Sequence, residues 1–196
     1  LASCKLIGVR TIMGAEESKT HFTASVRLAR NAVDRDKSDA PPAAGETTVK
    51  DQDIYRVYFH GPAYQVLDAA WRDNGVVVGR MSDKLPGDRQ PAELPLLTEP
   101  RLIELCFQTA GVWQIGTTGR MGLPKHIDQV SIVRPADQAE GRLHAVVSPK
   151  DGGQSYDAYV ADEAGNLFVV LRGYQTAELP DDVDPSMRKP LLAAMD

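Results

Sequence analysis

The stretch PRLIELCFQTAGVWQI, residues 100–115, decides the fold. Its apolar residues recur three and four positions apart, which is typical of a wide apolar face on an α-helix. These residues are Leu102, Ile103, Cys106, Phe107, Ala110 and Trp113. Thr98 is placed to cap such a helix, and Pro100 suits its first turn. We therefore predict a helix over residues 99–115.

Short strand candidates lie on both sides of this helix along the chain. They occupy residues 64–72, 76–82, 126–134, 141–149, 154–162 and 166–177. The strongest turn between them is Asp73-Asn74-Gly75, because Asn-Gly tolerates the positive φ angles of a tight hairpin. A long apolar helix among antiparallel strands buries its faces only when the sheet wraps around it. The sequence thus predicts an α+β hot-dog fold, a curled antiparallel sheet around one central helix.

The rest of the chain divides by composition. Residues 1–33 contain two strand candidates, at 5–12 and 18–29, which need a partner sheet because two strands alone are marginally stable. Residues 34–52 are charged and rich in Pro, Ala and Asp, which indicates an exposed linker. Residues 53–178 hold the densely patterned domain. Residues 179–196, with three aspartates near their start, are expected to form a solvated tail.

Composition excludes several classes of function. The 196 residues carry a net charge of −5 and a pI near 5.4, which argues against a nucleic-acid groove or an anionic membrane surface as partner. No apolar run approaches membrane-spanning length. The two cysteines, Cys4 and Cys106, have no metal-ligand spacing, so we expect no metal site and a reducing, cytoplasmic location.

Glu104 and Gln108 form the candidate site for chemistry. They stand four residues apart, so both project from the same face of the predicted helix. A carboxyl group among apolar neighbours loses hydration, which favours its protonated form and allows it to act as an acid. The alternative is a solvated helix face on which Arg101 pairs with Glu104.

Three motifs in order resemble a known family. They are FHGPAYQ at residues 59–65, PRLIELCFQ at 100–108 and GLPKHI at 122–127. The same order, an aromatic-x-Gly-Pro-x-aromatic motif, a DxxxQ or DxxxH helix and a Leu-Pro motif, is found in the second half of polyketide and polyunsaturated fatty acid synthase dehydratase domains. The resemblance implies a double hot dog. Residues 53–178 would be its C-terminal unit and residues 1–33 the closing strands of an incomplete N-terminal unit.

The resemblance also implies a reaction. A β-hydroxyacyl thioester loses water to give an α,β-enoyl product, while the phosphopantetheine arm of an acyl carrier protein holds the substrate and no other cofactor is used. Glu104 matches the carboxyl that protonates the leaving hydroxyl, and Gln108 matches its polar partner. The implied partners are the carrier protein, other synthase domains and a second hot dog, in a homodimer or pseudo-dimer. The residues implied to line the substrate pocket are His60, Gly61, Pro62, Tyr64, Leu123 and Pro124.

Two departures from the family pattern keep other functions open. Glu104 stands where the family has Asp, and the family's HxxxGxxxxP motif, which carries the base histidine, is missing from these residues. We expect the base to lie outside this chain; among the four histidines, His60 is nearest to the site. The alternatives are a non-catalytic hot dog for dimerisation or carrier-protein docking, and a hot-dog thioesterase or cyclisation-template domain.

Overall fold

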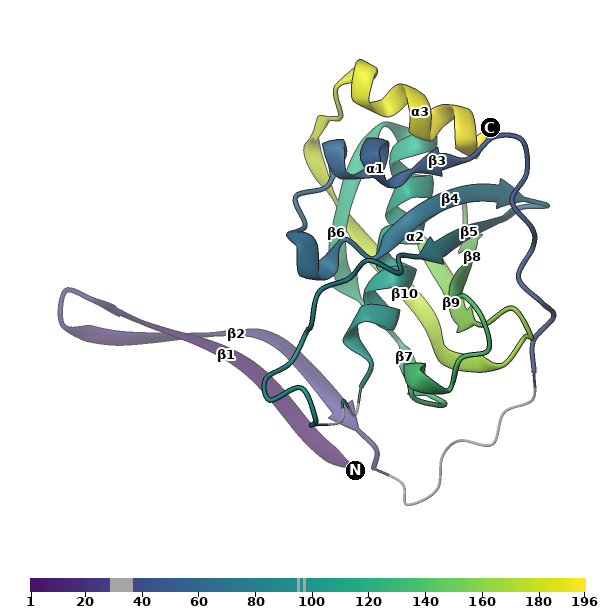
Figure 1. Ribbon diagram of the computed structural model, residues 1–196. Coiled ribbons are helices and arrows are strands. Elements are labelled where there is room, and N and C mark those ends of the chain that lie inside the picture. The colour runs from purple at the N-terminus through teal and green to yellow at the C-terminus, as the bar shows by residue number, and fades with distance from the viewer. Residues whose placement is uncertain (29–36, 95, 97) are drawn as a thin grey trace. The chain divides into compact units, whose positions relative to one another are not determined.

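The computed structural model describes residues 1–28, 37–94, 96 and 98–196. The chain forms two compact units, Leu1–Ala32 and Val33–Asp196, and each is described by itself. The second unit holds one eight-stranded antiparallel sheet, in which the strands run in the order β3-β4-β5-β8-β9-β10-β6 and β7 also pairs with β10 (Figure 1). Its strands are β3 (Val49–Lys50), β4 (Leu67–Asp73), β5 (Val76–Met81), β6 (Arg120–His126), β7 (Gln129–Ile132), β8 (His144–Lys150), β9 (Ser155–Ala161) and β10 (Leu167–Asp182).

The long helix α2 (Pro100–Thr118) lies within the curl of this sheet, which confirms the predicted hot-dog arrangement (Figure 1). Leu102, Leu105 and Ile115 are fully buried in the main core. A close approach between α2 and β5 requires Gly79, because a Cβ atom there would collide with the side chain of Thr109. This tight contact places one face of α2 directly against the sheet. The elements described below pack against its other faces.

The ends of α2 differ in part from the prediction. The capping residue is Glu99, in a left-handed conformation with φ of 43°, and no side chain caps the helix, so the prediction for Thr98 was wrong. The Glu99 carboxylate instead accepts a hydrogen bond from the backbone N–H of Ala136 at 3.3 Å. At the other end the chain leaves the helix through Gly119, whose φ of 82° suits glycine.

The strand predicted at 126–134 corresponds to β7, whereas β6, which precedes it, was not predicted. The prediction missed β6 because Leu123-Pro124 lies inside it, and proline usually ends a strand pattern. β6 stands at the end of the sheet order, where a residue without a backbone N–H is tolerated. β7 then pairs with the opposite end of β10, from Val169 to Arg172.

Two further helices were not predicted. Helix α1 (Asp51–Val57) follows directly on β3, so the structured domain begins inside the segment expected to be linker; residues 34–36 of that segment lie outside the described residues. Helix α3 (Pro185–Met195) replaces the expected solvated tail, and its Leu191, Ala194 and Met195 are buried in the main core. The Asp184 side chain caps α3 by accepting from the Ser186 N–H at 2.8 Å, a start signal that the sequence does contain.

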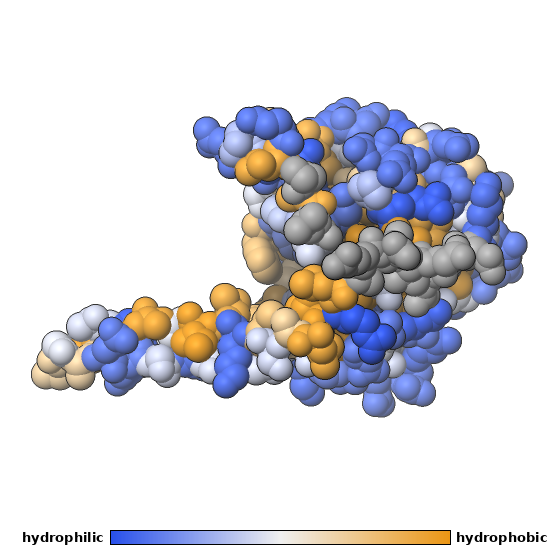
Figure 2. Space-filling view, turned by 90° about the horizontal axis from the view of Figure 1, so that it is seen from below, coloured by the Kyte–Doolittle hydropathy of each residue, from blue (hydrophilic) through white to orange (hydrophobic). Residues whose placement is uncertain are grey.

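The first unit is a hairpin of β1 (Ala2–Ile12) and β2 (Ala15–Val26), close to the strands predicted there. A register shift between Leu6 and Ile7 interrupts the pairing. Apolar side chains occur along the hairpin among polar ones (Figure 2). Leu6 is 60% exposed and its cross-strand partner Phe22 is 57% exposed, so the two strands alone do not form a core.

In the described part of the chain, no helix combines the length and the apolar character needed to cross a membrane.

Candidate functional site

Glu104 lies in the first half of α2 and holds two polar partners on one carboxylate oxygen. Its Oε1 is 2.9 Å from Gln108 Nε2 and 3.0 Å from His60 Nε2. The side chains of Glu104 and His60 are 20% and 21% exposed, so the pair is enclosed but open to solvent at one side. The alternative interpretation required an ion pair between Arg101 and Glu104, and this pair is not formed. Arg101 donates to the Ala63 carbonyl at 2.9 Å and lies 3.6 Å from Asp88.

His60 is held rigidly by its neighbours in the chain. Phe59 stacks on its ring with centroids 5.1 Å apart, and the edge of Tyr58 meets it at 5.3 Å. Gln65 Nε2 donates to the His60 carbonyl at 3.0 Å, which closes the turn around the short 3₁₀ helix Pro62–Tyr64. The Nδ1 atom of His60 is buried and has no hydrogen-bond partner within the described residues. The ring is therefore presented to Glu104 through Nε2 alone.

Gln108 connects the Glu104 carboxylate to the surrounding backbone. Its Nε2 also donates to the Tyr64 carbonyl at 2.7 Å, and its Oε1 accepts from the Tyr55 hydroxyl at 2.8 Å. The same hydroxyl accepts from the Leu67 N–H at 2.7 Å. Gln108 is only 2% exposed, and every hydrogen-bonding atom of its amide points at a named partner. The amide is therefore fixed in one orientation.

Burial keeps the tyrosines of this site protonated. It raises the pKa of Tyr55 well above its ordinary value, so the phenol stays a hydrogen-bond donor. Burial likewise raises the pKa of Tyr58, whose hydroxyl donates to the Gln108 carbonyl at 2.9 Å. In Tyr174 burial is again the main cause of a raised pKa, and the nearby Glu104 charge adds to it. Tyr174 also stacks on Phe107, with the ring centroids 4.4 Å apart.

The structure brings together some, but not all, of the residues predicted for the site. His60 contacts Glu104 and the Tyr64 carbonyl contacts Gln108, whereas Gly61 and Pro62, which lie between them in the chain, are exposed. Leu123 and Pro124 lie on β6, where they pair with Ala177 and Thr176 of β10.

The contact between this part of the sheet and α2 lies away from the carboxylate. Thr176 donates to Gln114 Oε1 at 3.0 Å. Gln114 is ten residues beyond Glu104, about 15 Å along the helix axis. Leu123 and Pro124 are therefore not placed beside Glu104 by this contact.

Sequence reasoning missed Tyr55 and Tyr58. Tyr55 lies on α1, which was not predicted, and Tyr58 is the C-cap residue at which this helix ends. The first turn of α1 carries Asp51 and Asp53, which is typical of a helix start. That signal could have identified the helix, but not its contact with α2.

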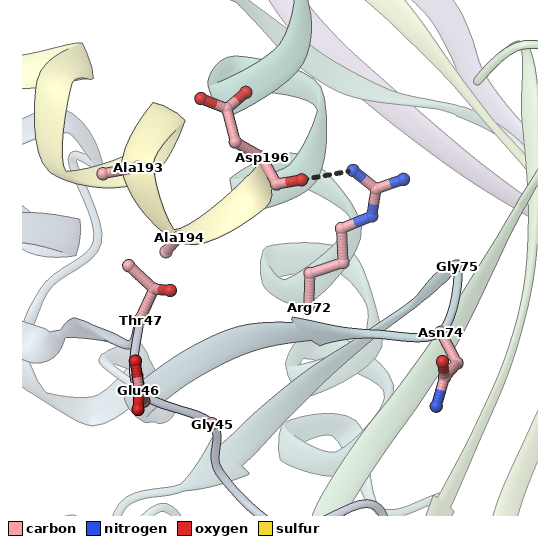
Figure 3. A pocket seen from close by; sticks show the side chains of 9 residues that line it. All are labelled: Gly45, Glu46, Thr47, Arg72, Asn74, Gly75, Ala193, Ala194 and Asp196. Carbon is pink, nitrogen blue, oxygen red and sulfur yellow. Dashed lines mark hydrogen bonds between the residues drawn. The ribbon is translucent and has the colours of Figure 1, made fainter.

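A separate recess of about 330 Å³ lies beside the end of α3 (Figure 3). Arg72 of β4 reaches across it and donates to the carbonyls of Met195 at 2.7 Å and Asp196 at 3.3 Å. An arginine at this position satisfies carbonyls at the helix end and complements the negative end of the helix dipole. We interpret this recess as the seat of α3, without a role in the chemistry.

Replacing Arg72 by alanine should destabilise the second unit by about 1–2 kcal/mol, because the last carbonyls of α3 lose their cation. Chemical denaturation of the wild type and the variant measures this change. The matched control is Lys189→Ala on the same helix, whose side chain is exposed and should change stability by less than about 0.5 kcal/mol. Equal effects of the two substitutions would contradict the role assigned to Arg72.

No group of three or more His, Cys, Asp or Glu side chains within the described residues is arranged to hold a metal ion.

The fold and the sequence have relatives among known proteins. At the level of sequence, 138 residues are 27% identical to one of the subunits of a polyunsaturated fatty acid synthase from Thraustochytrium sp.; they cover 66% of this chain and 5% of that protein. A crystal structure of an inactive mutant of the CurJ dehydratase matches 97% of this chain and 66% of its own, with a TM-score of 0.63 at 20% identity. A dehydratase domain from a trans-AT polyketide synthase of Brevibacillus brevis matches 90% of this chain and 64% of its own, with a TM-score of 0.61 at 17% identity.

A family model supplies the assignment. The model described as "Polyketide synthase dehydratase N-terminal domain" matches residues 27–186. That description names the N-terminal part of these dehydratases, whereas the motif order predicted the C-terminal half, so the assignment to one half stays a prediction. The model spans most of the chain, and the chain belongs to the polyketide synthase dehydratase family.

Proposed function

We propose that this chain provides the acid of a dehydratase that converts a β-hydroxyacyl thioester on an acyl carrier protein into an α,β-enoyl thioester. The observation that carries the proposal is a single carboxyl group, Glu104, held at one oxygen by Gln108 and His60 and partly open to solvent. Membership of the dehydratase family supports the class of reaction. The similarity to part of a polyunsaturated fatty acid synthase supports a place among other synthase domains.

The Glu104 carboxyl group can provide what the reaction needs most, a proton for the leaving hydroxyl. Hydroxide is a poor leaving group, so the β-hydroxyl must receive a proton as its C–O bond breaks. Protonated Glu104 gives that proton and becomes a carboxylate, and a base takes the α-proton, whose electron pair forms the C=C bond. The products are water and the enoyl thioester.

The proposal includes the partners that such a site needs. The substrate arrives on the phosphopantetheine arm of the carrier protein, and no other cofactor takes part. The base is a histidine outside this chain, brought to Glu104 by a second hot dog in a dimer or pseudo-dimer. The proposed setting is reducing and cytoplasmic, where the free thiols of Cys4 and Cys106 would persist.

The product of the reaction tests the proposal. A β-hydroxyacyl thioester of a carrier protein is incubated with the full chain, alone and together with the upstream part of its synthase, and the products are identified by mass spectrometry. With the upstream part present, we expect loss of one water in the wild type and none in Glu104→Ala, and we expect no dehydration by the chain alone. Release of the free acid instead would show a thioesterase. Equal dehydration by wild type and Glu104→Ala when the rest of the synthase is present would show that Glu104 is not the acid and would favour a non-catalytic module.

A further inference from the structure

The hydrogen bonds around Gln108 have directions that the backbone alone determines. The Leu67 N–H can only donate, so the Tyr55 oxygen accepts from it and gives its own single proton to Gln108 Oε1. The Tyr64 carbonyl can only accept, so the Gln108 group that faces it is the NH₂ group. These two independent backbone anchors require the same orientation of the Gln108 amide.

This orientation determines what the Glu104 oxygens can do. The second proton of Gln108 Nε2 points at Glu104 Oε1, which is therefore an acceptor. His60 Nε2 lies 3.0 Å from the same oxygen, and two acceptors would repel each other at that distance.

The same reasoning gives the hydrogen-bonding roles of the other polar atoms of His60 and Glu104. His60 Nε2 carries a proton and donates it to Glu104 Oε1. His60 Nδ1 is buried without a partner in the described part of the chain, a position that a lone pair tolerates better than an N–H group does. Oε1 then accepts two hydrogen bonds, and among the described residues Oε2 has no hydrogen-bond partner, which leaves it for a substrate or for an acidic proton.

We propose that His60 is a positioning residue that donates Nε2–H to Glu104 Oε1, and that Glu104 Oε2 is the oxygen that meets the β-hydroxyl of the substrate. This inference rests on the proposed dehydratase function and deepens it. His60 is then not the base that removes the α-proton, because its Nε2 lone pair is occupied by a proton and its Nδ1 is buried.

The need for such a donor follows from the length of the glutamate side chain. Glutamate has one rotatable bond more than aspartate, so its carboxyl group reaches more positions. Hydrogen bonds from Gln108 and His60 to the same oxygen select one of these positions and thereby aim Oε2. A misplacement of about 1 Å can cost on the order of 10²-fold in rate, so loss of the His60 donor should lower kcat more than it changes KM.

Two substitutions separate positioning from base catalysis. His60→Gln keeps an N–H donor but cannot accept a proton at physiological pH, whereas His60→Ala removes both abilities. In the dehydration assay with carrier-protein substrate we expect kcat to fall about 10²-fold in His60→Ala and less than about 10-fold in His60→Gln, with KM within about 3-fold. A comparable loss of more than about 10³-fold in both would identify His60 as a base and overturn the inference. Unchanged kcat in both would overturn it as well.

A measurement that does not depend on activity also tests whether His60 donates a proton from Nε2. Imidazole ¹⁵N chemical shifts distinguish a protonated from a bare ring nitrogen, and His60→Gln assigns the His60 signal among the four histidines. We expect a protonated Nε2 and a bare Nδ1 in the folded wild-type chain. A bare Nε2 would overturn the inference, even if His60→Ala fails to fold.

The kinetic result for Glu104 keeps the two proposals apart. Full activity of Glu104→Gln would remove the dehydratase proposal, and the inference about the role of His60 with it. Loss of activity in Glu104→Gln together with unchanged activity in His60→Ala would remove only the inference.

Discussion

Glutamine at position 104 is expected to lower kcat for dehydration about 10³-fold and to leave KM within a few-fold. An amide has no proton that it can give to a leaving hydroxyl. Its carbonyl oxygen can still accept from Gln108 and His60, as Oε1 does in the wild type. The network and the fold should therefore persist, and the loss should fall on the chemical step. Steady-state kinetics with a carrier-protein substrate, with circular dichroism as the test of folding, measure this effect.

Aspartate at the same position provides a graded comparison. Glu104→Asp keeps an acid but withdraws the carboxyl group by one methylene, so we expect a loss of about 10²-fold in kcat. The matched control is Glu93→Gln, an exposed glutamate that should retain wild-type kinetics. If Glu104→Asp were as active as the wild type, this pocket would not depend on the longer side chain.

The largest expected effect on stability belongs to Asp162, a fully buried carboxylate in the turn between β9 and β10. Its Oδ1 accepts from the backbone N–H groups of Ala164 at 3.0 Å and Asn166 at 2.9 Å. Its Oδ2 accepts from the Glu140 N–H and the Asn166 side chain, each at 2.9 Å. Asp162→Ala leaves these donors without their partner. We expect a loss of about 3–4 kcal/mol in the free energy of unfolding and a Tm lower by about 10 °C.

The pH dependence of this effect identifies its cause. Burial alone would raise the pKa of Asp162, but the hydrogen bonds from Glu140, Asn166 and Ala164 outweigh it and hold the pKa below its ordinary value of 3.8. A carboxylate with a lowered folded pKa stabilises the fold above the unfolded pKa, and this stability is lost as the pH falls through the folded pKa. The difference between wild type and Asp162→Ala should thus be full near pH 6 and shrink below about pH 3.8.

An exposed aspartate provides the control for that experiment. Asp181→Asn should change the free energy of unfolding by less than about 0.5 kcal/mol at each pH, because its side chain is exposed. Urea denaturation at several pH values measures both variants. A difference for Asp162→Ala that does not change between about pH 6 and pH 3 would show that the carboxylate charge is not its source.

The sequence by itself determined the hot-dog arrangement and the face on which Glu104 and Gln108 stand. Both depend on local sequence: residues 100–115 repeat at helical spacing, and Asp73-Asn74-Gly75 favours a tight hairpin turn. Local patterns also placed the hairpin strands β4 and β5 close to their observed bounds. Such features can be predicted from the sequence because residues close together in the chain determine them.

The tertiary structure alone decided which residues meet Glu104. His60 precedes Glu104 by 44 positions in the chain, and Tyr55 precedes Gln108 by 53 positions. No sequence periodicity relates residues that the fold brings together from such separate segments. Helix α3 illustrates the same limit, because its charged beginning indicated a solvated tail, whereas contact with α2 buries Leu191 and Met195. Spacing selected Glu104 as an acid, but only the directions of the hydrogen bonds from Leu67 through Tyr55 and Gln108 show which of its oxygens is free to act.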